Sequence, residues 1–101
     1  VVHIKGVKLA VFENCSATDG QKDGFNYYPH NGKVTNAIEI NCIGKRNGTD
    51  GRGSDQGSTQ HAGGKVIRIN GTYSENNGSN IADDGVGTQL TFSLILMSTC
   101  F

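Results

Sequence analysis

Apolar and polar residues alternate one by one along three stretches of this chain, and this period of two constrains the fold most. The stretches are residues 7–11, 33–43 and 89–97. Successive side chains of an extended strand point to opposite faces, so this pattern predicts β-strands. No segment of helical length repeats apolar residues with the spacing of a helix face. The chain is therefore predicted to be all-β.

The stretch 33–43 is predicted to be a half-buried strand. Val34, Ile38, Ile40 and Cys42 share one face, which we expect to point into the core, and Glu39 lies on the other face. Near the start of the chain the apolar positions switch from even to odd numbers at Gly6. A strand cannot switch faces without an inserted residue or a break, so Gly6 predicts a bulge or a kink between two sheets.

The 101 residues are enough for one domain, here 1–101. Asn-Gly pairs are typical of two-residue hairpins, and they occur at Asn31-Gly32 and Asn70-Gly71. Strands joined by hairpins predict a single-domain antiparallel β-sandwich of the immunoglobulin-like or jelly-roll-like kind, with about six or seven strands. Residues 44–64 contain seven glycines and no periodicity, and are expected to form one long loop within it.

The three cysteines form no C-x-x-C pair, which argues against a zinc ribbon or a thioredoxin-like site. In an alternating meander, Cys15 and Cys42 end strands that run the same way, so they are expected to form a disulfide and to leave Cys100 free. Asp83 and Asp84 are weak candidates for a cation site, and the turn that an Asp-Gly pair favours is the preferred explanation of these residues. We expect no metal and no cofactor.

Four Asn-x-Ser/Thr sequons, at Asn14, Asn47, Asn70 and Asn77, predict a glycosylated protein that is secreted or displayed at a cell surface. Nine basic residues balance nine acidic ones, which argues against a nucleic-acid partner. No apolar run approaches the ~20 residues of a membrane-spanning helix, so membrane insertion is not expected.

The N-terminal segment favours a structural function. Val1, Val2 and Ile4 form a short apolar segment ahead of Gly6, and such a strand can pair with another chain. This predicts an extracellular protein whose copies associate into a surface filament or a pilus-like polymer, without enzymatic activity.

Two alternatives remain open. Tyr27, Tyr28 and Tyr73 could stack on sugar rings in a secreted carbohydrate-binding module or lectin, whose partners would be glycans. His30 and Glu39 are the acid–base candidates if the chain is a small secreted toxin or hydrolase.

Overall fold

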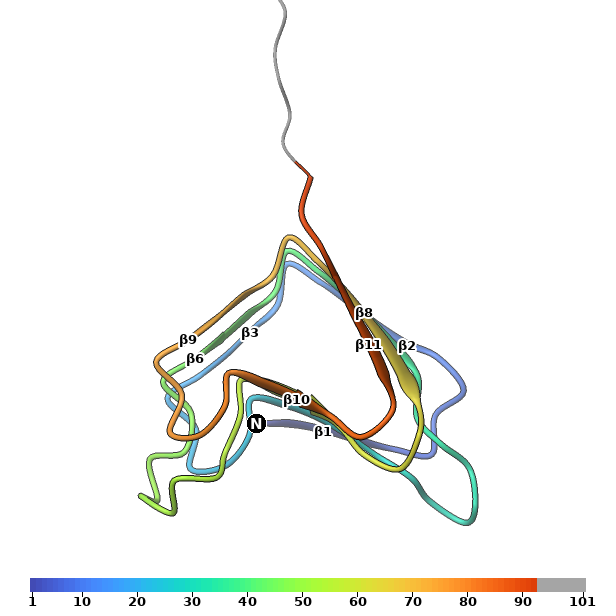
Figure 1. The fold of residues 1–101 in the computed structure, drawn as a ribbon, viewed down its shortest axis with the longest axis horizontal. Helices are drawn as coiled ribbons and strands as arrows, with labels where there is room; N and C mark the ends of the chain where they lie inside the picture. Colours follow the sequence, from blue (N-terminus) through green and yellow to red (C-terminus); the bar gives the residue numbers. More distant parts are fainter. Residues whose placement is uncertain (93–101) are drawn as a thin grey trace, which may run out of the picture.

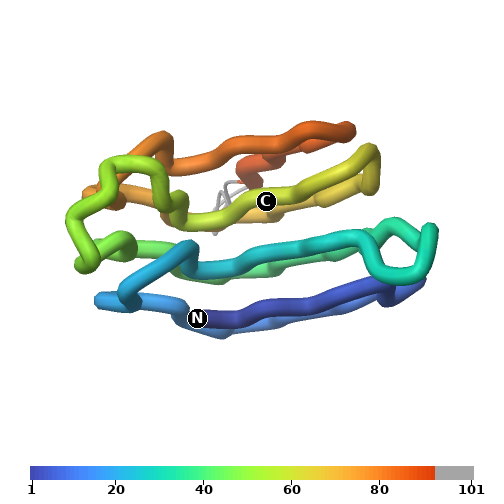
Figure 2. The backbone as a smooth tube through the Cα atoms, turned by 90° about the horizontal axis from the view of Figure 1, so that it is seen from below, coloured from blue at the N-terminus to red at the C-terminus, as the bar shows by residue number. Residues whose placement is uncertain are grey.

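The structure is a computed structural model that describes residues 1–92. It is a β-solenoid, in which the chain winds into coils and each coil adds one strand to each of three parallel sheets. Viewed along the stack, the three sheets form the sides of a triangle (Figure 1). Viewed from the side, the coils lie one above the other, from the N-terminal coil onward (Figure 2).

The described residues form three full coils and the first two strands of a fourth. Sheet A contains β1 (Val2–Lys5), β4 (Phe25–Tyr28), β7 (Ser58–Gln60) and β10 (Ile81–Asp83). Sheet B contains β2 (Ala10–Glu13), β5 (Ala37–Ile40), β8 (Lys65–Ile69) and β11 (Val86–Leu90). Sheet C contains β3 (Ser16–Thr18), β6 (Ile43–Lys45) and β9 (Thr72–Ser74).

The chain is all-β as predicted, but the antiparallel sandwich is wrong. Every pairing between these strands is parallel, and each strand pairs with its counterpart in the next coil. Asn31-Gly32 does form the expected tight turn, in which His30 and Lys33 exchange backbone hydrogen bonds. Asn70-Gly71 does not form a hairpin, because it joins strands of two different sheets. A turn dipeptide specifies a local reversal or corner, but not the pairing of the strands beside it.

Left-handed asparagines turn each coil from sheet B into sheet C. Asn14, Asn41 and Asn70 have φ angles of 56°, 52° and 52°. Asparagine tolerates this region better than other residues that have a Cβ, because its short amide can bond locally. The three asparagines recur at intervals of 27 and 29 residues, each directly after a strand. The sequence therefore contains the repeat of a solenoid, which the one-by-one alternation of apolar and polar residues does not reveal.

The kink expected at Gly6 lies at the corner between sheets A and B, where its φ is 61°. A Cβ on this glycine would lie 2.8 Å from the Cβ of His30, so the corner is closed to larger residues. The predicted loop 44–64 is only partly a loop: it contains most of β6 and all of β7, whose three residues are buried.

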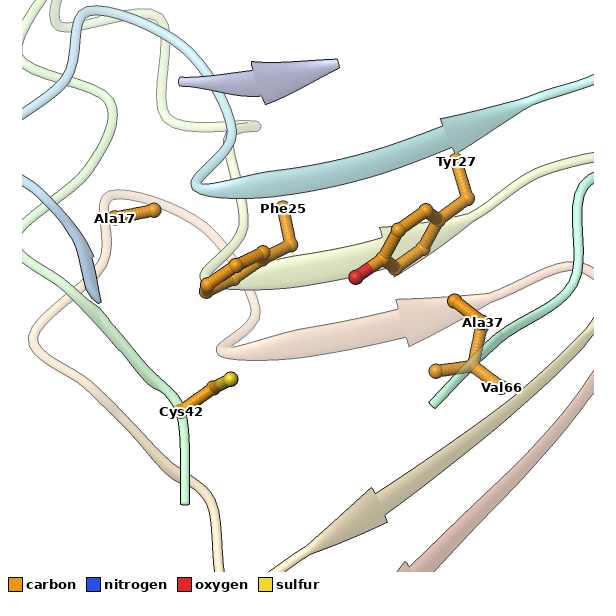
Figure 3. Close-up of a cluster of buried hydrophobic side chains, with 6 residues drawn as sticks. All are labelled: Ala17, Phe25, Tyr27, Ala37, Cys42 and Val66. Carbon is orange, nitrogen blue, oxygen red and sulfur yellow. The ribbon is translucent and has the colours of Figure 1, made fainter. Parts of the chain in front are cut away.

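The apolar core lies inside the first coils, where Phe25 and Tyr27 are fully buried (Figure 3). Phe12 packs against both of these rings, with centroid distances of 5.7 Å and 6.2 Å. The remaining members of the buried cluster are small: Ala17, Ala37, Cys42 and Val66. The other large, fully buried side chains are polar: Glu39, Gln60 and Arg68.

The alternation along 33–43 is real, but the expected orientation of β5 is wrong. Glu39 points inward and is fully buried, whereas Ile38 and Ile40 lie on the outer face and are half-buried. Cys42 is buried as predicted, because the chain turns at Asn41 and the alternation restarts in the next sheet.

Glu39 is compatible with the interior because three hydroxyl groups satisfy its carboxylate. Tyr27 Oη donates to Oε2 at 2.8 Å, Ser58 Oγ donates to Oε2 at 2.6 Å, and Tyr73 Oη donates to Oε1 at 2.5 Å. These donors come from three strands in two coils. Burial and the Glu39 carboxylate raise the pKa of Tyr27 and of Tyr73 well above the usual value for a phenol.

Arg68 is the second buried charge, in the next coil of the same column. Its Nη1 and Nη2 donate to the two oxygens of Asp83 at 2.7 and 2.8 Å, and its Nε donates to Ser58 at 2.8 Å. Nη1 also donates to Gln89, and Nε lies 3.8 Å from Oε2 of Glu39. The third and fourth coils thus have a polar interior that is held together by side-chain hydrogen bonds rather than by apolar packing.

Cys15 and Cys42 are both free thiols, so the predicted disulfide is wrong. Cys100, predicted to be free, lies outside the described residues. Within residues 1–92 no helix is long and apolar enough to span a membrane.

Candidate ligand-binding site

A hollow of about 440 Å³ lies over the outer face of sheet A. Its floor comes from the outward positions of β1 and β4, and its walls come from the segments that precede β4 and β7. The lining residues on the strands are His3, Lys5, Asn26 and Tyr28, and those on the walls include Lys22, Asp23, Arg52, Ser54 and Asp55.

The parallel register of β1 and β4 builds the floor. It aligns His3 with Asn26 and Lys5 with Tyr28, so two polar residues of each strand lie side by side on the outside. The residues between them, such as Ile4 and its partner Tyr27, point into the core. The sequence alternation therefore separates the core from the hollow within one strand pair.

Asn26, which lines the hollow, has a buried side-chain oxygen without a hydrogen-bond partner. Its Nδ2 donates to Oδ2 of Asp23 at 2.6 Å, and this bond fixes the orientation of the amide because a carboxylate can only accept. The other oxygen of Asp23 accepts the backbone N–H of Gln56 at 2.7 Å. The exposed fraction of Asn26 is only 6%, yet its Oδ1 has no hydrogen-bond partner.

Asp55 presents a second unpartnered oxygen, Oδ2, and this residue is only 7% exposed. Burial raises the pKa of Asp55, and the nearby Asp50 carboxyl raises it further. Asp50 behaves in the opposite way: the hydrogen bond from Lys22 Nζ, at 2.6 Å, lowers the pKa of Asp50 to about 2. The pKa values of these two neighbouring carboxyl groups are thus shifted in opposite directions.

Aromatic rings lie along the outer face of sheet A, from His3 and Tyr28 in the hollow to His61 outside it. Tyr28 stacks on His61 with centroids 4.1 Å apart and an interplanar angle of 13°, and His3 lies 5.0 Å from Tyr28 on its other side. The Nδ1 of His61 lies 3.6 Å from Oδ2 of Asp84. Residues from four successive coils therefore meet on this face, at positions that follow the sheet register.

Of the three tyrosines expected to stack on sugars, only Tyr28 faces outward. Tyr27 is fully buried, and Tyr73 is half-buried and donates to Glu39. The alternative hydrolase pair is not brought together, because Glu39 is enclosed in the interior while His30 is exposed in a turn.

Asp83 and Asp84 do not form a joint cation site. Asp83 points inward to Arg68, and Asp84 points outward to His61. Among the described residues, no group of three or more acidic, histidine or cysteine side chains is arranged to hold a metal ion.

Three of the four sequon asparagines, Asn14, Asn70 and Asn77, are exposed. Asn47 is 2% exposed, and its Nδ2 donates to the carbonyl of Ala17 at 2.8 Å. An oligosaccharyl chain on that amide would require the bond to break.

The predicted contact strand is part of the solenoid itself. Val2 and Ile4 pack against the core, β1 pairs with β4 within the chain, and Val1 is exposed beside the hollow. Sequence reasoning missed Asn26, Asp55 and His61 as site residues. Only the asparagine repeat could have revealed them, since it sets the coils in register and so brings their outer positions together.

Comparison with protein-family models, with curated proteins and with solved structures found no match to this chain.

Proposed function

We propose that this protein binds a carbohydrate chain on the outer face of sheet A. The observation that carries the proposal is the hollow itself, whose lining combines amide, carboxylate and cationic side chains with the aromatic ring of Tyr28. Amide and carboxylate oxygens accept hydrogen bonds from hydroxyl groups, and Lys and Arg side chains donate to them. Sugars offer many hydroxyl groups within a small volume.

The remaining features of the face suit the same ligand. Lys5 on the floor and Arg52 on a wall of the hollow supply hydrogen-bond donors. Tyr28, whose ring stacks on His61, lines the same hollow and adds aromatic surface that the C–H groups of a sugar can contact. An extracellular location, which the sequons predict, is part of this proposal, as is binding without cleavage.

A glycan array probed with the purified protein tests this function. We expect binding to at least one class of oligosaccharide, and a large loss of that signal in Asn26→Ala and in Tyr28→Ala. Lys33→Ala is the matched control, because Lys33 is exposed at a different corner of the solenoid. Absence of binding to any glycan, or equal binding by all three variants, would contradict the proposal.

A second candidate is the filament subunit. The parallel, in-register stacking of the coils favours it, because β1 uses one edge to pair with β4 and the described residues place no strand on its other edge. Electron microscopy of the purified protein tests this candidate: regular filaments are expected, and particles of single-chain size at high concentration would refute it.

A further inference from the structure

Four asparagines of this chain directly precede a glycine, and such a pair favours spontaneous deamidation of the asparagine. They are Asn31, Asn47, Asn70 and Asn77. The backbone nitrogen of the following residue can attack the side-chain carbonyl carbon of asparagine, and glycine hinders this attack least because it has no Cβ. In sequence the four pairs are equivalent, but the fold places them in different surroundings.

The reaction requires both reacting groups to be free to move. A bond forms between the backbone nitrogen of the glycine and Cγ of the asparagine, and the amide nitrogen leaves as ammonia with the proton of the backbone nitrogen. Water then opens the five-membered succinimide, which gives aspartate or isoaspartate. The asparagine must rotate into line for the attack, so hydrogen bonds that hold its amide or the glycine oppose the reaction.

Asn47-Gly48 is held at both reacting groups. Asn47 Nδ2 donates to the carbonyl of Ala17 at 2.8 Å, and Asn47 Oδ1 accepts the backbone N–H of Gly20 at 3.1 Å. The backbone N–H of Gly48 donates to the carbonyl of Gly20 at 2.8 Å. The nucleophile and the amide of this pair are therefore both engaged.

Asn70-Gly71 is exposed, but it is restrained at the corner between sheets B and C. Oδ1 of Asn70 accepts the backbone N–H of Phe92 at 2.7 Å, and the backbone N–H of Asn70 donates to the carbonyl of Leu90 at 2.8 Å. Gly71 lies against the ring of Tyr73. This corner therefore resists the rotation that the attack requires.

Asn77-Gly78 is exposed and restrained in a similar way, in the loop between β9 and β10. Nδ2 of Asn77 donates to the carbonyl of Gly48 at 3.2 Å, and the backbone N–H of Asn77 donates to the carbonyl of Asn47 at 2.9 Å. A Cβ on Gly78 would lie 2.6 Å from the carbonyl oxygen of Asp55, so this glycine is closely packed.

Asn31-Gly32 differs from the other three pairs. Both residues are exposed at the tip of the turn between β4 and β5, and a Cβ on Gly32 would meet nothing within 4 Å. Within residues 1–92, no hydrogen bond engages the Asn31 side chain or the backbone N–H of Gly32. The backbone bonds between His30 and Lys33 close the turn below this tip, and they leave both reacting groups free.

We propose that Asn31 is the site at which the folded protein deamidates, and that the fold protects the other three asparagines. Water is the co-reactant, and the step needs no enzyme and no cofactor. The product carries a new negative charge, and the isoaspartate form also lengthens the backbone of the two-residue turn. Asn31 does not line the proposed carbohydrate site, so this modification is independent of that function.

Incubation of the folded protein at mildly alkaline pH, followed by peptide mass spectrometry, tests the inference. A host that does not glycosylate should supply the protein, so that all four amides are free at the start. Asn31 should convert to aspartate and isoaspartate at least about tenfold faster than the other three asparagines, because their restraints must first break. In protein unfolded by urea, the four asparagines should convert at similar rates.

A matched pair of variants gives a second test by ion-exchange chromatography, which separates the deamidated form by its added charge. In Asn31→Gln this acidic form should stop accumulating, because glutamine closes the corresponding ring far more slowly. Asn77→Gln is the control, and it should accumulate the acidic form like the unmodified protein. Conversion of Asn47, Asn70 or Asn77 as fast as Asn31 in the folded protein overturns the inference, as does accumulation that Asn77→Gln stops and Asn31→Gln does not.

Discussion

Raising the pH above the ordinary range of tyrosine ionisation should unfold this protein, and Tyr27 should account for much of the effect. Tyr27 is fully buried and donates to Glu39 at 2.8 Å, and its pKa in the folded protein is raised far above the usual value of about 10. The unfolded chain releases this proton near pH 10, whereas the folded protein retains it. Stability from this group is therefore complete below about pH 10 and is lost as the pH rises.

The size of the effect follows from the difference in proton binding. With an unfolded pKa of about 10, the loss from Tyr27 is about 1.4 kcal/mol at pH 11 and about 2.7 kcal/mol at pH 12. Tyr73 donates to the same carboxylate and its pKa is also raised, but it is only half-buried, so it adds a smaller loss in the same direction. A domain of this size has about 5–15 kcal/mol of stability in total, so the loss is large enough to measure.

Urea unfolding followed by far-ultraviolet circular dichroism, at several values between about pH 8 and about pH 12, provides the assay. Tyr27→Phe should be less stable than the unmodified protein near pH 8, by about 1–2 kcal/mol for the lost hydrogen bond. Near pH 12 this difference should vanish or reverse, because phenylalanine has no proton to lose.

Tyr28→Phe is the control, since Tyr28 faces outward and is not part of the Glu39 network. Its stability should follow that of the unmodified protein at every pH. If the stability difference caused by Tyr27→Phe stays constant from pH 8 to pH 12, the reasoning about the buried network is refuted.

Three further changes have definite expected outcomes. Arg68→Met leaves Asp83 buried without its guanidinium partner, so it should lower the free energy of unfolding measured in urea by about 3–5 kcal/mol. Arg46→Met is the control: Arg46 belongs to a solvent-exposed ion pair, so its loss should change the urea midpoint little. Asn41 has a φ of 52°, so Asn41→Ala should lower stability by about 1 kcal/mol while Asn41→Gly should not; equal midpoints for the two variants would contradict the left-handed corner. Peptide mass spectrometry of protein secreted by a glycosylating host should find Asn47 unmodified, and a glycan there would show that its buried hydrogen bonds do not protect it.

The alternation of residues by itself predicted an all-β chain, and Gly6 marked the first corner. Of the stretch 7–11, however, only Ala10 and Val11 lie in a strand, and residues 93–97 of the third stretch lie outside the described residues. The recurring asparagines at positions 14, 41 and 70 also mark the repeat of the solenoid, which is a signal separate from the period of two. These signals are local: they depend on backbone sterics and on the side-chain direction of each strand.

Only the tertiary structure decided which face of each strand points inward. On β5, hydropathy favours Ile38 and Ile40 for the core, yet the core receives Glu39. That choice depends on hydroxyl donors from Tyr27 and Ser58, which lie 12 and 19 residues away from Glu39 and reach it only when the coils stack.

The binding hollow was undetermined by the sequence for the same reason. Asn26 and Asp55 come from separate strands and loops, and neither has a recognisable motif around it. A period of two fixes alternation but not orientation, because inverting a strand leaves its pattern unchanged. The orientation of β5 follows only from long-range hydrogen bonds, which stabilise the buried carboxylate of Glu39. The aliphatic residues of the strand then lie on its outer face.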